Sequence, residues 1–407
     1  MRFNIKCISI ALNTKLTDVA SSNRLLRALW ASLRQEFGNL GWLYQPIKDG
    51  DSCRIYFGHA SMVTTSICIG VSYKERGIVD HILFEDIFID KSDPIISRLK
   101  NCVRTAEIAT ESDFFMASEI ITPSRYLFQD FNELNIFSLL TIDNRTSLNL
   151  RVSAFDQYDA DHNFNLSIRP IIDVLSAFSN LFFGIGKPNF SSTSYLDHII
   201  QRPEYTLDAD WIDGYPMIDG KIAMPDHCLK LVKDIAQNNI NEDKQLILDA
   251  CHHFHSARSL EQQAFESSRT ETLSEMAMVL YISCFEVLSL IDAPSLETCK
   301  TCSQPQYRIS ARVKEFVDRH LGANAADMVK NIYNDRSKYL HTGRLLSSRS
   351  FHYDTSPGLI PQLDPSASNG VRSPMATLHI NLREFTSYCI RAVTYDFYNR
   401  QSSNESA

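Results

Sequence analysis

Apolar positions follow two different periods along the chain. In the first 239 residues, short alternating or continuous apolar runs, typical of strands, are mixed with a few stretches of helical spacing. From residue 243 onward, apolar residues recur mainly every three or four positions, as they do on one face of a helix. The predicted fold class is therefore α+β, with an N-terminal mixed α/β region followed by a C-terminal all-α region.

The N-terminal region, residues 1–239, contains predicted strands and helices separated by turns, and a subdivision near residue 125 stays open. Residues 74–77 and 143–145 are predicted turns. Residues 184–187 lack the spacing of a phosphate-binding loop and are predicted to be a turn after a helix. Residues 184–224 are expected to be a connector. Strands are predicted near 3–10, 62–73, 78–89, 134–142 and 148–155, and helices near 24–37, 95–108, 169–183 and 226–237.

The C-terminal region is predicted to form a separate helical domain over residues 240–400, followed by a tail at 401–407. Both the charge balance and the apolar period change near residues 238–241. The Ser- and Pro-rich residues 344–376 fit no helix and are predicted to be a long loop. Five helices are expected, at 243–263, 271–290, 307–321, 325–340 and 378–398.

Composition and charge are those of a soluble globular protein. No apolar run approaches the roughly 18 residues that span a bilayer, so no membrane contact is expected. Ten scattered cysteines, several on apolar faces, favour reduced thiols and a cytoplasmic location. The net charge of −8 disfavours an extended nucleic-acid-coating surface. Any RNA contact would then depend on a local basic cleft.

Arg336 falls within the apolar stripe of the fourth predicted C-terminal helix, close to Val329, Ile332 and Leu340. A guanidinium is costly to bury alone, so it is expected either in an ion pair or in a cleft between helices. His341 follows five positions later. On a regular helix it would point about 140° away from Arg336. The two would converge only if the helix ended near Leu340, or if two subunits shared the site.

The stretch from Arg336 to His341, followed by Gly343, resembles the Arg-x4-6-His motif of the HEPN superfamily. Tyr333 and the Arg-Ser pair make it most similar to the Apea-like branch. This resemblance covers residues 240–400. It implies a HEPN-like helical bundle that acts as a homodimer through its C-terminal domain, and a metal-independent endoribonuclease in anti-phage defence or a toxin-like response. Ser337 departs from the Asn, Asp or His that is common at that position in other branches.

The same resemblance gives residue roles as expectations. His341 would exchange a proton with the RNA 2′-oxygen or the leaving 5′-oxygen, and Arg336 would stabilise charge on the phosphate. Glu286, in the apolar run Cys-Phe-Glu-Val-Leu, is expected close to Arg336, either orienting it or taking part in proton transfer. The structural alternative for all three is a helix-end histidine and a buried ion pair. Candidate substrate-binding residues are Lys338, Tyr339 and Arg344.

Cysteines and histidines of the C-terminal region offer the alternative of a zinc site. Cys299 and Cys302, with Cys251 and His255, offer four zinc-ligand side chains, but plain thiols are preferred because no second CxxC exists. His252, His253 and His255 are expected to be ordinary helix residues. No metal or cofactor is expected, and a metal-dependent nuclease is disfavoured. The alternative function is a non-catalytic HEPN-like module that binds a nucleotide, RNA or a protein partner.

Overall fold

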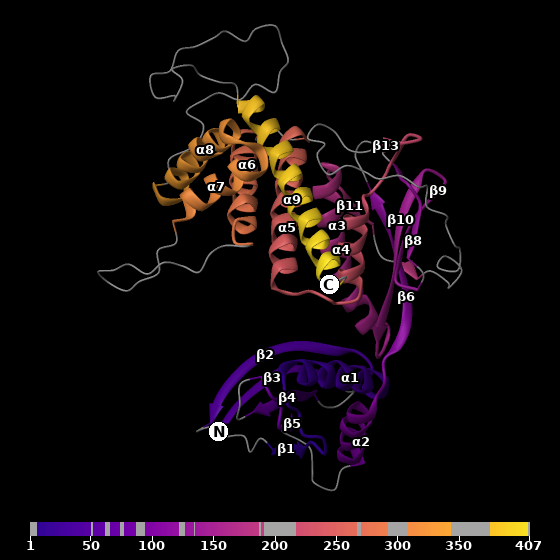
Figure 1. Cartoon of the computed structure of the whole chain (residues 1–407). Helices are drawn as coiled ribbons and strands as arrows, with labels where there is room; N and C mark the ends of the chain where they lie inside the picture. The colour runs from indigo at the N-terminus through magenta and orange to yellow at the C-terminus, as the bar shows by residue number, and fades with distance from the viewer. Residues whose placement is uncertain are drawn as a thin grey trace. The chain divides into compact units, whose positions relative to one another are not determined.

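The chain combines helices with antiparallel sheets and is α+β, as the sequence predicts (Figure 1). It divides into two compact units, unit 1 with Met1–Phe114 and Val152–Asn163, and unit 2 with Phe115–Arg151 and Phe164–Ala407. The computed structural model describes residues 6–49, 52–61, 66–73, 77–86, 94–121, 127–133, 135–186, 189–190, 217–266, 270–291, 308–342 and 375–405.

Unit 1 contains a five-stranded antiparallel sheet with two helices packed on one face. Asp18 caps the first helix, because its Oδ1 accepts the backbone N–H of Ser21 at 2.7 Å. The sheet order is β1-β5-β4-β3-β2. The elements are β1 (Lys6–Ala11), α1 (Val19–Phe37), β2 (Leu40–Asp49), β3 (Ser52–Ser61), β4 (Ser66–Tyr73), β5 (His81–Asp86) and α2 (Pro94–Ile108).

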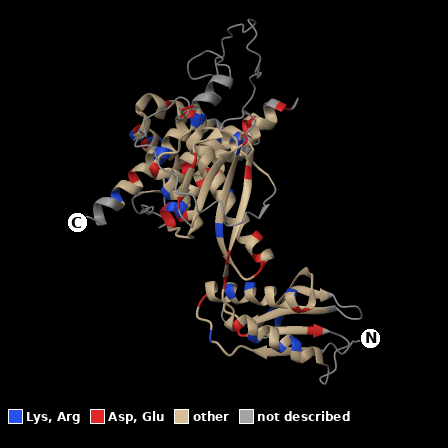
Figure 2. Cartoon of the chain, turned by 90° about the vertical axis from the view of Figure 1, so that its right-hand side faces the viewer, with Lys and Arg blue, Asp and Glu red and all other residues tan. Residues whose placement is uncertain are grey.

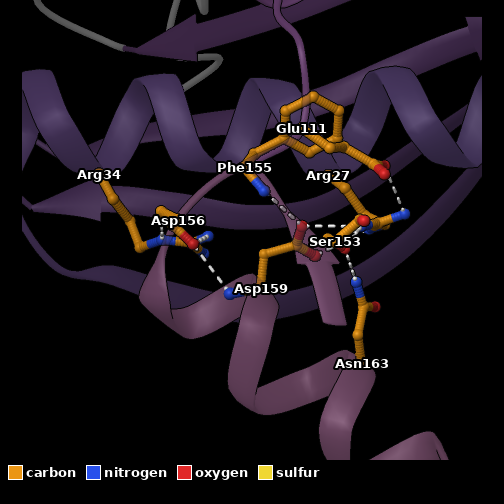
Figure 3. Close-up of polar contacts among 8 residues, drawn as sticks. All are labelled: Arg27, Arg34, Glu111, Ser153, Phe155, Asp156, Asp159 and Asn163. Atoms are coloured by element: carbon orange, nitrogen blue, oxygen red, sulfur yellow. Dashed lines mark hydrogen bonds and ion pairs between the residues drawn. The ribbon is translucent and has the colours of Figure 1, made fainter. Parts of the chain in front are cut away.

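Residues 152–163 return to unit 1 and are bound to α1 by two arginines (Figure 3). Arg27 and Arg34 lie seven positions apart and so share a helix face. Arg27 binds Asp159 through two contacts of 2.8 Å, and Arg34 binds Asp156 at 2.7 and 2.9 Å. Asp156 also accepts the backbone N–H of Asp159 at 2.8 Å. The same carboxylates thus pair with α1 and stabilise the first turn of α3 (Gln157–Ser179).

Unit 2 contains the remaining sheets. One has the order β11-β6-β10-β9-β8, with β12 also paired to β6, and a smaller one has the order β13-β14-β7. Asp143 and Asn144, both with positive φ, close the β9–β10 hairpin, and Asp219 and Gly220 close the β13–β14 hairpin. The strands are β6 (Ser112–Ile121), β7 (Leu127–Phe128), β8 (Phe131–Glu133), β9 (Phe137–Ile142), β10 (Arg145–Ala154), β11 (Gly184–Ile185), β12 (Asn189–Phe190), β13 (Met217–Ile218) and β14 (Lys221–Ile222).

The helices of unit 2 pack side by side (Figure 1). Helix α5 lies along α6, α7 lies along α8, and α9 contacts α4, α5, α6 and α7. The Ser387 hydroxyl of α9 donates to the Ala177 carbonyl of α3 at 2.6 Å, so α3 belongs to the same packing. Besides α3, the helices are α4 (Asp226–Ala236), α5 (Glu242–Glu266), α6 (Thr270–Leu288), α7 (Ile309–Leu321), α8 (Ala323–Thr342) and α9 (Met375–Glu405).

All nine helices predicted from periodicity are present, and two predictions need correction. Among the longer strands, β2, β3 and β6 were not predicted. Helix α3 begins at Gln157 instead of near residue 169, although Pro170 lies inside it. Pro170 has no N–H to donate to the Leu166 carbonyl one turn earlier, and Leu166 is 62% exposed, so the proline lies next to the solvent side of the helix. Gly184 and Ile185 form the strand β11 paired to β6, and not a turn.

Unit 2 also extends across the predicted boundary near residue 239. Tyr398 of α9 donates its hydroxyl proton to Asp234 of α4 at 2.6 Å, and Asn180, just after α3, donates to Glu384 of α9 at 2.5 Å. These contacts join α3 and α4 to the C-terminal helices. The predicted loop at 344–376 lies outside the described residues, apart from the first two positions of α9.

Among the described helices, none has a stretch both long and apolar enough to cross a membrane.

His227 of α4 lies between two aromatic rings in the core of unit 2. Its ring centroid is 5.4 Å from the ring of Phe178 and 5.4 Å from that of Tyr395, and its side chain is buried. Burial, and then the charges of Arg391 and Lys230, lower the pKa of His227 to about 4. The folded state therefore holds this imidazole in its neutral form.

We expect His227 to make unit 2 sensitive to acid. The unfolded chain binds the proton near pH 6.5, whereas the folded chain binds it only near pH 4. The contribution of His227 to the free energy of unfolding is therefore constant above pH 6.5. About 3 kcal/mol of that free energy is lost as the pH falls from 6.5 to 4. In urea unfolding at pH 7 and pH 4.5, His227→Phe should lose less stability on acidification than wild type. His162→Phe, at an exposed position, should behave like wild type. An equal loss of unfolding free energy between pH 7 and pH 4.5 in all three proteins would contradict this assignment.

Candidate functional site

Helix α8 presents a buried apolar stripe that ends in a charged residue. Ala326, Val329 and Ile332 are almost completely buried. Arg336 follows Ile332 by one turn, on the same side of the helix. Its side chain keeps 17% of its surface exposed. The side chain therefore lies at the margin of the helix packing, with its Nε buried.

Glu286 of α6 binds this arginine through both carboxylate oxygens. Arg336 Nη1 donates to Glu286 Oε1 and Nη2 donates to Oε2, each at 2.8 Å. The predicted proximity of Glu286 and Arg336 is confirmed. The glutamate side chain is 18% exposed, so the two groups are desolvated to the same degree. Parallel contacts of this kind are the strongest form of arginine–carboxylate pairing.

Two further side chains surround the guanidinium. Ser283 lies one turn before Glu286 on α6, with its Oγ 3.5 Å from Arg336 Nη2. The Tyr333 ring has its centroid 5.9 Å from the central carbon of the guanidinium. Burial, and then the negative charge of Glu286, raise the pKa of the Tyr333 phenol. Tyr333 is thus a neutral hydrogen-bonding group beside the ion pair at ordinary pH.

The end of α6 is held in place by α7. Ser289 donates its hydroxyl proton to the Glu286 carbonyl at 2.7 Å and accepts from Arg312 Nε at 2.9 Å. These contacts fix the backbone that carries Glu286. Consequently, α6, α7 and α8 all contribute to the position of the ion pair.

Helix α5 brings three histidines to the same part of unit 2. His252 and His255 each place Nδ1 against Asp173 of α3, at 3.0 and 2.6 Å. Burial is the main cause of a lowered pKa at His253, and the charges of His252 and Arg336 add to it, while Asp249 opposes it. From the sequence, these histidines are expected to be ordinary helix residues. The spacing of a His-His-x-His run on one helix was the available signal.

The remaining predicted site residues are described only in part. Helix α8 is continuous through Thr342, so position 341 lies about 140° around its axis from position 336. The condition for convergence within one chain, a helix that ends near Leu340, is therefore not met. The side chains of His341, Lys338 and Tyr339, and all of Arg344, lie outside the described residues.

Metal ligation finds no support in the described part of the chain. No group of three or more His, Cys, Asp or Glu side chains there has the geometry to hold a metal ion. Cys299 and Cys302 lie outside the described residues. Cys251 is completely buried, and that burial raises the pKa of its thiol well above the usual value.

Charged residues of both signs are interspersed along the ribbon of each unit (Figure 2). The net charge of the chain is −8. Attraction of a polyanion to the ion-pair region would therefore depend on a few local cations and not on a broad basic face.

Breaking the Arg336–Glu286 pair should destabilise unit 2. Glu286→Gln leaves the guanidinium largely desolvated without its counter-charge, which we expect to cost about 3 kcal/mol. Chemical unfolding of the full chain measures the change. Asp327→Asn is the matched control, since it removes the acid of the exposed Lys314–Asp327 pair between α7 and α8 and should have a much smaller effect. Equal effects of the two substitutions would show that burial contributes nothing to the strength of the inner pair.

Comparison with known proteins does not identify a relative: no family model, curated protein or solved structure matches this chain.

Proposed function

We propose that this protein is a metal-independent endoribonuclease of the HEPN type. The observation that carries the proposal is the bidentate pair of Arg336 and Glu286, which holds an arginine side chain that is 17% exposed near the ends of α6 and α8. In this proposal the helices of residues 240–400 form the HEPN-like bundle, and residues 1–239 sense a trigger or restrain the nuclease. The setting would be cytoplasmic anti-phage defence or a toxin-like response, with two copies forming a homodimer.

The proposed reaction needs no cofactor. A base takes the proton of the RNA 2′-hydroxyl, the 2′-oxygen forms a bond to the adjacent phosphorus, and the bond from phosphorus to the 5′-oxygen breaks. An acid then supplies the proton that the leaving 5′-oxygen requires. The products are a 2′,3′-cyclic phosphate and a free 5′-hydroxyl. Arg336 would stabilise the additional negative charge on the phosphate oxygens as the 2′-oxygen attacks.

The ion pair leaves Arg336 able to act in this way. A guanidinium has five N–H groups, and the two contacts to Glu286 use two of them. Nη2 also lies 3.5 Å from Ser283 Oγ and Nε is buried, so the second N–H of Nη1 is the group that remains for a phosphate. Glu286 would fix the plane of the guanidinium, a positioning role in addition to its contribution to stability. His341 remains a proposed proton-transfer group, most simply in a site shared between two subunits.

A second candidate is a non-catalytic module that binds a nucleotide, RNA or a protein partner. The observation in its favour is the same ion pair, because Glu286 neutralises Arg336 as a purely structural partner would.

RNA cleavage by the full-length protein in the presence of a metal chelator tests the proposal. We expect wild type to cleave single-stranded RNA to products with cyclic phosphate ends. Arg336→Ala should lower the rate by at least about 100-fold, and His341→Ala should do the same if His341 transfers a proton. Arg319→Ala, at an exposed arginine of α7, is the matched control and should retain the wild-type rate.

Folding of each variant is checked by circular dichroism and thermal unfolding. Arg336→Lys keeps the positive charge but loses the bidentate contact, so it separates loss of the fold from loss of the guanidinium geometry. Wild-type protein that leaves RNA intact, or full activity in both alanine variants, would favour the binding module.

A further inference from the structure

His252 of α5 has one ring nitrogen fixed by a carboxylate. Its Nδ1 lies 3.0 Å from Asp173 Oδ2, and an ionised carboxylate can only accept hydrogen bonds. Nδ1 therefore carries the proton, and in the neutral ring Nε2 has the free lone pair. The His252 side chain is 67% exposed. Its Nε2 is thus an oriented proton acceptor or donor that a ligand can reach from solvent.

The second carboxylate oxygen of Asp173, Oδ1, contacts His255. His255 Nδ1 lies 2.6 Å from Asp173 Oδ1, and His255 Nε2 lies 2.9 Å from the Phe183 carbonyl. The Asp173 side chain is only 11% exposed. Because both nitrogens of His255 are occupied, its contribution is structural. It fixes the carboxylate that orients His252.

His253 lies on the side of α5 that meets the ion pair. The Cys284 thiol lies 3.2 Å from the Ala250 carbonyl, and the rings of Phe254 and Tyr281 are 5.5 Å apart. These two contacts set antiparallel α5 and α6 in register, so that His253 is level with the turn of α6 that carries Tyr281 and Ser283. The Ser283 Oγ lies 3.5 Å from Arg336 Nη2. The lowered pKa of His253, to which the charge of Arg336 contributes, agrees with this position.

We propose that His252 and His253, in place of His341, are the two proton-transfer residues of the site around Arg336, acting on a phosphodiester. His341→Ala should then keep the wild-type rate, and a loss of about 100-fold in that variant would oppose this assignment. This inference rests on the proposed ribonuclease function and deepens it. The ring centroids of the two histidines are 6.2 Å apart. Since a hydrogen bond spans about 2.7–3.0 Å, both rings can reach opposite oxygens of one phosphate.

The two histidines have different roles in this scheme. Neutral His253 accepts the proton of the 2′-hydroxyl as the 2′-oxygen bonds to phosphorus. Protonated His252 gives its Nε2 proton to the 5′-oxygen as the bond from phosphorus to that oxygen breaks. The histidines end with their protonation states exchanged, and water restores them. No oxidant, reductant or metal takes part, and Asp173 acts as a positioning residue.

Anion binding tests this arrangement without any need for catalysis. Histidine ¹⁵N and ¹H resonances of the full chain are followed during titration with inorganic phosphate. We expect the rings of His252 and His253 to shift together with one dissociation constant, and Arg336→Lys to weaken that binding. Exposed His162 of α3 should not respond. Absence of a shift at both rings would overturn the proposal.

Cleavage kinetics give the second test. His252→Asn and His253→Asn should each lower kcat at least about 100-fold with little change in KM. His253→Asn should remove the acidic limb of the pH–rate profile. Asp249 of α5 and Arg336 of α8 also act on His253, and Asp173 of α3 acts on His252. Glu286 of α6 binds Arg336.

Two controls complete the kinetic test. Asp173→Asn should lower kcat about 10- to 100-fold, because it no longer selects the tautomer of His252. His162→Asn should retain the wild-type rate.

The outcomes separate this inference from the proposed function. If wild type cleaves RNA and both asparagine variants keep its rate and pH profile, the histidine pair is overturned and the ribonuclease stands. If wild type cleaves no RNA, the ribonuclease proposal fails. The phosphate titration then decides whether His252, His253 and Arg336 form one anion site.

Discussion

Buried charge must meet opposite charge, and this constraint joins parts of the chain that are far apart in sequence. In unit 1, two arginines of α1 bind carboxylates more than 120 positions later. In unit 2, Asp173 meets two histidines about 80 positions later, and Arg336 meets Glu286 of another helix. A desolvated charge without its partner costs several kcal/mol, so each pair restricts which helix packings are allowed.

The same constraint connects stability to chemistry at the end of α8. The apolar stripe of Val329 and Ile332 draws the helix against its neighbours, and Arg336 comes one turn later at the margin of that contact. Glu286 compensates the positive charge of Arg336 at this largely desolvated position and also fixes the guanidinium plane. A group held rigidly yet partly open can act on a ligand without further ordering. Structural and proposed functional roles therefore coincide in one pair.

Periodicity predicted what depends on local pattern. The amphipathic helices and the hairpin at Asp143 and Asn144 were predicted because burial and turn chemistry are visible over a few residues. Strand β2 was missed because Trp42 and Tyr44 are exposed, at 75% and 62%, so its apolar residues do not mark a buried face. The start of α3 was missed because Pro170 resembles a helix beginning.

In the candidate site, too, some contacts could be predicted from local sequence and others could not. The pairing of Arg336 with Glu286 could be expected, since each is a charge within an apolar helical stripe that needs a partner. The role of Asp173 could not be expected from the sequence, because its contacts to His252 and His255 depend on how α3 packs against α5. Such contacts come from tertiary packing, and no local period encodes them.

The chain passes from unit 1 to unit 2, returns to unit 1 and then enters unit 2 again. This path limits which truncated fragments can keep the site intact. Strands β6 and β10 and helix α3 each carry residues of both units, so neither unit is a single continuous stretch of sequence. A fragment that began at residue 240 would keep Arg336 and Glu286 but lose Asp173. His255 would then retain neither its carboxylate nor the Phe183 carbonyl, and α5 would expose the face that α3 covers. The smallest piece that preserves the surroundings of these histidines must therefore include α3, far upstream of the predicted boundary.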